Sequence, residues 1–254
     1  DGDHAAFAVD LTDRDATKQA VEAASRQFGP PAILCAIAGG FDMGTPVHEV
    51  PAESWQKMMD LNLGTLLSVL AAVTPGMIER GAGKIVTIGA NGAKTGGKTM
   101  GPYAASKSAV MRVTESASAE LKGHGINVNS VLPSIIDTPE NRDAMPKADP
   151  GKWVTPESLA GVIAFLCSDD AKDIHGALVP VTGLSSWQCI CCHGPRASRS
   201  WLWHSRMKPS FGARSPGWKP GWSLCPLPKR STNVRHFPEI RREQGRCTGL
   251  YGGP

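Results

Sequence analysis

Short apolar runs alternate with longer segments of helical periodicity along residues 5–181 of this chain. Apolar runs bounded by turn-forming residues favour strands, whereas apolar residues spaced by one helical turn favour helices. Strict alternation of the two predicts an α/β fold with a doubly wound parallel sheet. The predicted strands are residues 5–10, 32–38, 84–88, 126–132 and 177–181, and the predicted helices start at Thr12, after Pro51, at Pro102 and at Thr155. A long loop is expected over residues 133–154.

The helix predicted after Pro51 is apolar on nearly all sides over residues 63–73. A helix of this kind is expected to be buried against the sheet and a partner. The same apolar stretch is too short and too interrupted to span a membrane, so no membrane association is expected. Cys35 and Cys167 each lie inside an apolar run, which predicts small buried side chains and suits a reducing cytosol. The lack of a recognisable signal peptide also predicts a cytoplasmic protein.

The pattern stops after Gly183, and the charge changes sign. Residues 1–186 carry a formal net charge of −6, whereas residues 187–254 carry +10 and hold five of the seven cysteines. Ile, Leu and Val number only seven in residues 187–254, without helical or strand periodicity. Such a segment buries too little apolar surface to offset its ordering entropy. We therefore expect a partial folded domain at residues 1–186 and a disordered, non-homologous tail at 187–254.

Two functional interpretations of this basic tail were weighed against disorder. Interleaved tryptophans and cations are compatible with nucleic-acid binding, and Cys189-Ile190-Cys191-Cys192-His193 is compatible with zinc binding. Basic patches of this kind are common by chance, and the cysteines lack a second ligand pair at regular spacing. Neither nucleic acid nor metal is therefore expected as a partner.

Tyr103 and Lys107 lie four residues apart at the start of a predicted helix, so both side chains project from one face. Reducing a carbonyl or an imine needs a proton as well as a hydride. A tyrosine whose pKa is lowered by a nearby cation can supply that proton near neutral pH. Most Tyr-x-x-x-Lys pairs are only a core ring and a solvated amine. The position of this pair, one loop after a strand, favours catalysis.

With these motifs in order, residues 1–186 resemble the short-chain dehydrogenase/reductase family, which has a Rossmann-like fold and uses NAD or NADP. The resemblance implies that Tyr103 delivers the proton and that Lys107 binds the nicotinamide ribose and lowers the pKa of Tyr103. It also implies that Asn62, in Leu61-Asn62-Leu63, holds a proton-relay water. The cofactor-binding residues implied by the family's motifs are Asp10, Leu11, Ala38, Gly39, Tyr103, Lys107, Pro133, Ile136 and Thr138.

The sequence departs from the family's pattern at three points. The glycine-rich Thr-Gly-x-x-x-Gly-x-Gly turn has no counterpart, because the sequence begins just before the family's third strand. A Rossmann-like domain lacking its first β-α-β segment is therefore expected, with weak dinucleotide binding. Ala90 stands where the family has its catalytic serine. Ala36 and Ile37 replace two asparagines near the adenosine ribose.

The loop after residue 136 resembles one branch of the family, the quinonoid dihydropteridine reductases. The match covers Asp-Thr-Pro-x-Asn-Arg-x-x-Met-Pro-x-Ala-Asp at residues 137–149 and the later Trp153. That branch also carries alanine at the position of Ala90. The resemblance thus implies hydride transfer between NAD(P)H and a carbonyl or a quinonoid imine of a small molecule, possibly dihydropterin-like, in a homodimer or homotetramer. The alternative is an inactive fragment or pseudoenzyme that at most associates with an intact subunit.

Overall fold

Strands alternate with helices in the computed structural model, which describes residues 4–185. The strands are β1 (Ile33–Ala36), β2 (Gly83–Ile88), β3 (Ile126–Pro133) and β4 (Leu178–Val181). The α-helices are α1 (Arg14–Phe28), α2 (Ala52–Met59), α3 (Thr65–Arg80), α4 (Gly101–Leu121), α5 (Pro139–Ala144) and α6 (Pro156–Cys167). One π-helical turn (Asp60–Gly64) and 3-10 turns at Asn91–Lys94, Lys122–His124, Pro150–Lys152 and Asp169–Ala171 complete these elements. The predicted tail, 187–254, lies outside the described residues.

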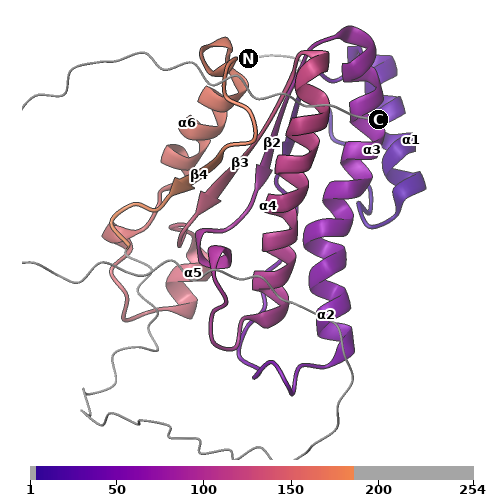
Figure 1. The fold of residues 1–254 in the computed structure, drawn as a ribbon. Helices are drawn as coiled ribbons and strands as arrows, with labels where there is room; N and C mark the ends of the chain where they lie inside the picture. Colours follow the sequence, from indigo (N-terminus) through magenta and orange to yellow (C-terminus); the bar gives the residue numbers. More distant parts are fainter. Residues whose placement is uncertain (1–3, 186–254) are drawn as a thin grey trace, which may run out of the picture. The chain divides into compact units, whose positions relative to one another are not determined.

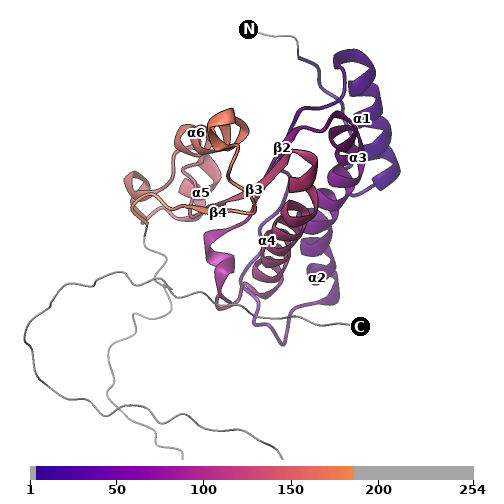
Figure 2. The same cartoon turned by 45° about the horizontal axis from the view of Figure 1, so that its top comes forward.

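The four described strands form one parallel sheet in the order β1-β2-β3-β4. Figures 1 and 2 show α1, α3 and α4 on one face of this sheet and α6 on the other. Parallel neighbours require crossover connections, and helices supply them on both faces. The predicted Rossmann-like α/β architecture is confirmed.

Alternation along β2 divides the core into two layers. Successive strand side chains point to opposite faces, so Ile85 and Val86 enter different layers. Ile85 packs with side chains of α3, α4 and β3, whereas Val86 packs with side chains of α6. The buried members of the two clusters are Val73, Met77, Ile85, Leu121, Ile126 and Val128 in the first, and Val86, Val131, Val154, Leu159 and Leu166 in the second. The central strands are therefore covered on both sides, as their continuous apolar sequence predicts.

Three local predictions are wrong. Residues 5–10 form no strand within the described sheet; most of their side chains are exposed, and no strand there pairs with them. Asp13, rather than Thr12, caps α1, because its carboxylate accepts hydrogen bonds from two backbone N–H groups of the first turn. The predicted loop 133–154 contains the short helix α5.

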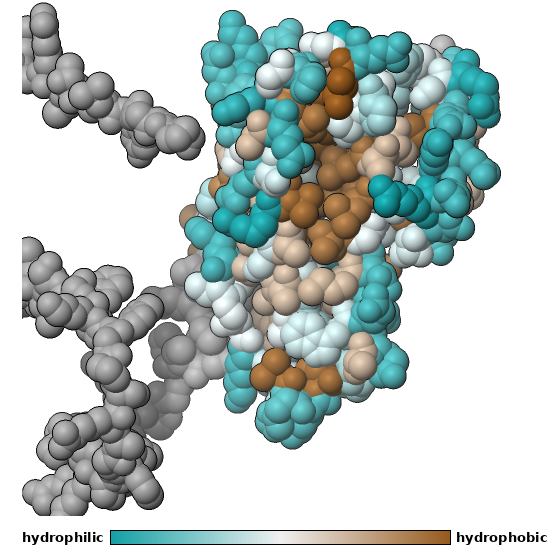
Figure 3. Space-filling view, turned by 45° about the vertical axis from the view of Figure 1, so that its right-hand side comes forward, coloured by the Kyte–Doolittle hydropathy of each residue, from teal (hydrophilic) through white to brown (hydrophobic). Residues whose placement is uncertain are grey.

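The helix after Pro51 is longer than its apolar stretch suggests. With the π-helical turn, α2 and α3 form one helix, Ala52–Arg80, of 29 residues. By length and composition this helix could cross a membrane, so the prediction that the apolar stretch is too short to span one is wrong. The core helix of a soluble protein passes the same test, and α3 packs against α1, β1 and β2. Figure 3 shows a hydrophobic stripe on the face that carries α3 and α4, and Leu67 and Ile78 of α3 are among the exposed apolar residues.

Asn127 joins the middle of the sheet to the segment that leads into β4. Its side chain is 4% exposed. Its Nδ2 donates hydrogen bonds to the carbonyl oxygens of Lys172 (2.8 Å) and Ile174 (3.0 Å), and its Oδ1 accepts one from Lys84 Nζ (2.9 Å). One buried carboxamide thus satisfies polar groups from two other parts of the chain, β2 and the segment before β4.

Asn127→Ala should lower the free energy of unfolding by about 1–3 kcal/mol, because it leaves buried carbonyls and an ammonium without a partner. Urea unfolding followed by circular dichroism measures the change. Gln27→Ala, on the exposed part of α1, should stay within about 0.5 kcal/mol of the parent. Equal midpoints for the two variants would contradict the role assigned to Asn127.

Candidate active site

The carboxyl ends of the parallel strands lie on one edge of the sheet, where ligands bind in doubly wound folds. β1 ends at Ala36, β2 at Ile88 and β3 at Pro133. Most of the predicted catalytic and cofactor-binding residues follow these three strands in the sequence or lie on helices beside them.

Asn62 lies in the π-helical turn, and its side chain is 2% exposed. Its Oδ1 accepts a hydrogen bond from the backbone N–H of Gly40 (2.9 Å), and its Nδ2 donates to the carbonyl oxygen of Gly40 (3.1 Å). The same Nδ2 donates to Ser106 Oγ (3.0 Å). Asn62 therefore fixes both the backbone after β1 and the first turns of α4. π-helical turns occur often at functional sites.

Gly39 is held against this cluster so closely that no side chain fits. A Cβ atom there would lie 2.6 Å from Asn62 Oδ1 and 3.1 Å from Lys107 Nζ. The first of these distances is shorter than any ordinary contact. The backbone of Gly39 thus reaches two predicted catalytic side chains, and glycine is required at this position.

Lys107 is buried, with 7% of its surface exposed, and its Nζ donates a hydrogen bond to the carbonyl oxygen of Ile88 (2.9 Å) at the end of β2. Burial disfavours the charged form and lowers the pKa of Lys107 to about 8. The ammonium therefore lies at the sheet edge, between the ends of β1 and β2.

Tyr103 packs beside Phe41, with ring centroids 4.7 Å apart in an edge-to-face arrangement. Burial raises the pKa of Tyr103 to about 12. Burial is the cause of this shift, and the prediction that Lys107 lowers the pKa of Tyr103 stays a prediction. Ala90 is 5% exposed and belongs to the apolar cluster against which Tyr103 packs.

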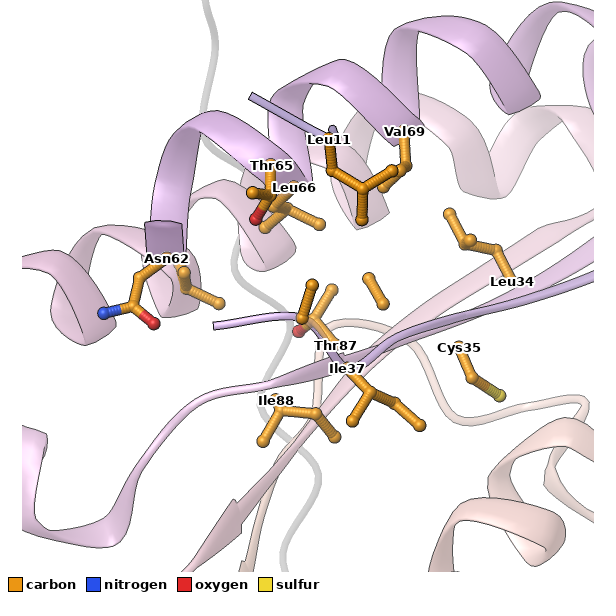
Figure 4. Close-up of a pocket in the computed structure, with 13 residues that line it drawn as sticks. Leu11, Leu34, Cys35, Ile37, Asn62, Thr65, Leu66, Val69, Thr87 and Ile88 are labelled. Carbon is orange, nitrogen blue, oxygen red and sulfur yellow. The ribbon is translucent and has the colours of Figure 1, made fainter. Parts of the chain in front are cut away.

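A cavity of about 180 Å³ lies between β1 and the helix carrying Asn62 (Figure 4). Three of the predicted site residues, Leu11, Ala38 and Asn62, line it. Most of the other lining side chains are apolar: Leu34, Ile37, Leu66, Val69, Ile88 and Val110. Neither Tyr103 nor Lys107 lines this cavity, so the candidate site has an apolar part beside β1 and a part with the predicted catalytic pair at the start of α4.

The remaining predicted residues lie around this centre. Asp10 is exposed, and its carboxylate accepts hydrogen bonds from the backbone N–H and the hydroxyl of Thr12, which lower its pKa. Pro133 is buried at the end of β3. Thr138 caps α5, because its Oγ1 accepts a hydrogen bond from the N–H of Asn141 (3.3 Å). The Nδ2 of Asn141 in turn donates to the carbonyl oxygen of Ile136 (2.8 Å).

Ser106 is a residue of this site that the sequence reasoning missed. Its side chain is fully buried, and its Oγ donates to the carbonyl oxygen of Tyr103 (2.9 Å) while accepting from Asn62 Nδ2. The available signal was its position on α4, three residues after Tyr103, on the helix face that meets the π-helical turn.

Comparisons with known proteins agree with this geometry. The family model described as Enoyl-(Acyl carrier protein) reductase matches residues 1–183. The chain is 35% identical over 192 residues to a (3R)-3-hydroxyacyl-CoA dehydrogenase of Rattus norvegicus, covering 72% of this chain and 74% of the relative.

Solved structures give the same fold. A short-chain type dehydrogenase/reductase from Mycobacterium ulcerans is 28% identical with a TM-score of 0.66, covering 69% of this chain and 68% of the other. A gluconate 5-dehydrogenase from Burkholderia cenocepacia J2315, in complex with NADP and tartrate, is 26% identical with a TM-score of 0.64. That match covers 68% of this chain and 72% of the other. The sheet order, the Tyr103–Lys107 turn at the start of α4 and these matches agree: the chain belongs to the short-chain dehydrogenase/reductase family.

Proposed function

We propose that this chain transfers a hydride between NAD or NADP and the carbonyl–alcohol couple of a small-molecule substrate. The observation that carries the proposal is the meeting of Gly39, Asn62 and Lys107 at the carboxyl ends of β1 and β2, one helical turn from Tyr103. Buried ionisable groups at such a sheet edge are typical of catalytic sites.

The described residues fit a dinucleotide at its nicotinamide end. The backbone at Gly39 lies close to the side chains of Asn62 and Lys107 because glycine carries no side chain. We infer that Lys107 holds ribose hydroxyls, that Ala38 and Gly39 contact the ribose from the other side, and that Pro133, Ile136 and Thr138 border the nicotinamide. Asp10 and Leu11 border the adenine. When bound, the dinucleotide supplies or accepts the hydride.

Tyr103 is the source of the proton that accompanies the hydride in this proposal. With a pKa of about 12, the phenol keeps its proton at neutral pH and is an acid ready to protonate a developing alkoxide. Near pH 8 Lys107 changes its charge, because its pKa is about 8. Asn62, through its bonds to Gly40 and Ser106, holds the helix turn in the position where the relay water is expected. A protonated Tyr103 is the form that reduction of a carbonyl requires.

The substrate class follows from the relatives. The rat relative is named for a hydroxyacyl-CoA and the Burkholderia relative for gluconate. Both names indicate a secondary alcohol and its ketone, which favours that couple over a quinonoid imine or a dihydropterin. The loop match to dihydropteridine reductases at residues 137–149 remains a resemblance of sequence.

We also propose that the chain forms a homodimer or homotetramer. The hydrophobic stripe over α3 and α4 is the surface on which a homodimer or homotetramer would form, because Leu67 and Ile78 expose apolar side chains there. A cytoplasmic location remains a prediction of the sequence.

Tyr103→Phe should lower the rate of NADH or NADPH oxidation with a ketone panel of 3-oxoacyl thioesters and keto-sugar acids by at least about 10²-fold, because the general acid is removed. Absorbance at 340 nm measures the rate. Tyr251→Phe is a matched control, since the chain contains only two tyrosines. Equal rates for Tyr103→Phe and the parent would rule out the assignment.

Stability should depend on pH through Lys107. Its folded pKa is about 8, against an ordinary value of 10.5, so the unfolded chain binds a proton that the folded chain lacks between these values. The free energy of unfolding should therefore rise with pH across this window, by about 3 kcal/mol from this group. Tyr103, raised from 10.0 to about 12, acts in the opposite sense above pH 10.

The measurement is urea unfolding at intervals between pH 7 and pH 10. Lys107→Met should abolish most of the rise, whereas Lys98→Met, an exposed lysine, should keep it. A rise of the same size in both variants would show that other groups cause it.

Ala90 favours a second candidate function, a non-catalytic subunit, because it places a methyl group where the family has a hydroxyl. If the missing hydroxyl makes the chain inactive, Ala90→Ser should raise the rate of carbonyl reduction at least about 10-fold above that of the parent. The serine would restore one hydrogen bond to the developing oxyanion. Ala93→Ser, in the same apolar cluster, is the control. A parent that already reduces ketones as fast as Ala90→Ser would rule out the non-catalytic interpretation.

A further inference from the structure

Cys35 and Cys167 are 132 residues apart in the sequence, yet their sulfur atoms lie 4.0 Å apart. Cys35 is on β1 and Cys167 is the last residue of α6. The prediction that both are buried is wrong, because Cys35 is exposed and Cys167 is half-buried. β1 is at the edge of the described sheet, where only β2 flanks it. Figure 4 shows the sulfur of Cys35 directed away from Leu34 and Val69.

The two sulfur atoms are close enough for a disulfide to form after a small movement. A bond between the two sulfurs needs a separation of about 2.05 Å, so they must approach by about 2 Å. Side-chain rotation supplies movements of this size, and an exposed cysteine on an edge strand has room to rotate. Cys167 packs in the cluster of Val86 and Leu166, and Val86 is the register partner of Cys35. Both thiols therefore lie near Val86, Cys35 on the neighbouring strand and Cys167 at the end of α6.

The two thiols differ in reactivity. Burial, followed by the charge and hydrogen bond of Cys35, raises the pKa of Cys167 to about 11, and the nearby Lys84 opposes this shift. Cys167 thus stays protonated at neutral pH, whereas Cys35 is open to solvent. An exposed first thiol beside a shielded second thiol is the arrangement of an attacking and a resolving cysteine.

We propose that Cys35 is a modification site for low-molecular-weight disulfides, such as oxidised glutathione, and that Cys167 resolves the adduct into a reversible Cys35–Cys167 disulfide. This inference does not rest on the proposed catalytic function.

The chemistry balances in two steps. The thiolate of Cys35 attacks one sulfur of the oxidised glutathione, breaking its S–S bond, forming a Cys35–glutathione disulfide and releasing one glutathione thiolate. Cys167 then gives its proton to solvent, and its sulfur attacks the sulfur of Cys35. The mixed disulfide breaks, the Cys35–Cys167 bond forms, and a second glutathione leaves. Two protein thiols are oxidised, and one glutathione disulfide is reduced to two thiols.

The bond would join the end of α6 to β1. In the described part of the chain, α6 packs mainly on β2 and β3. The residues immediately after Cys35, Ala36 to Ala38, line the cavity beside β1. A covalent link at Cys35 would therefore hold the strand end on which the cavity depends.

The test uses the full chain in millimolar mixtures of reduced and oxidised glutathione, followed by alkylation, non-reducing digestion and mass spectrometry. Five further cysteines lie in residues 187–254, so the linked peptides must be identified individually. The expected product contains Cys35 joined to Cys167 and reverts with excess reduced glutathione. Joining of Cys35 only to cysteines of residues 187–254, or no product at Cys35, would overturn the proposal.

Two variants separate the steps. Cys167→Ser should accumulate the glutathione adduct on Cys35 at least about 10-fold above the parent, because the resolving thiol is gone. Cys35→Ser should leave Cys167 unmodified, and Cys247→Ser is the matched control. Adduct levels in Cys167→Ser equal to those of the parent would contradict the assignment of Cys167.

A second measurement does not depend on any variant. The oxidised parent should melt at least about 4 °C above the reduced parent, because a bond across 132 residues constrains the unfolded chain. Equal melting temperatures for samples in which mapping finds the bond would contradict its formation within the native fold.

Discussion

The side chain of Asn62 holds the candidate active site of this fold together. Its carboxamide bonds to both backbone groups of Gly40 and to Ser106, so three segments far apart in sequence share one buried polar group. Because those partners lie in a dry interior, each bond costs free energy if it is broken. The close approach of Gly39 to Lys107 follows from this arrangement, since the strand end cannot move without disturbing Asn62.

Two ionisable side chains of α4 lie near that carboxamide, Lys107 buried and Tyr103 half-buried, and both have lost water around them. Tyr103 keeps its proton and Lys107 loses its own more readily for the same reason, the low dielectric around each. The neutral forms of both side chains are therefore favoured. A site of this kind is costly for stability, which is the usual relation between active sites and the rest of a fold.

The sequence periodicity predicts most helices and strands, but it does not predict the side-chain contacts between them. The spacing of apolar residues predicts α4, β2 and β3, because this spacing depends only on residues close together in the sequence. The bonds of Asn62 reach 22 and 44 residues along the chain, and no local pattern encodes them. Cys35 lies in an apolar run that indicates burial, but the edge position of β1 exposes it. The pKa of Tyr103 depends on burial, which a spacing of four residues to Lys107 does not reveal.

The π-helical turn around Asn62 also sets a rule for how this chain tolerates change in length. Such a turn holds one residue more than a regular helix turn, and each residue advances a helix by about 100°. The extra residue is absorbed inside this turn, so removing one residue between Asp60 and Gly64 would restore ordinary winding and leave α2 and α3 in nearly the same rotational phase. Side chains of α2 that now meet α4 would keep facing it. The same deletion in the regular winding of α3 would instead turn the residues on one side of it by about 100°.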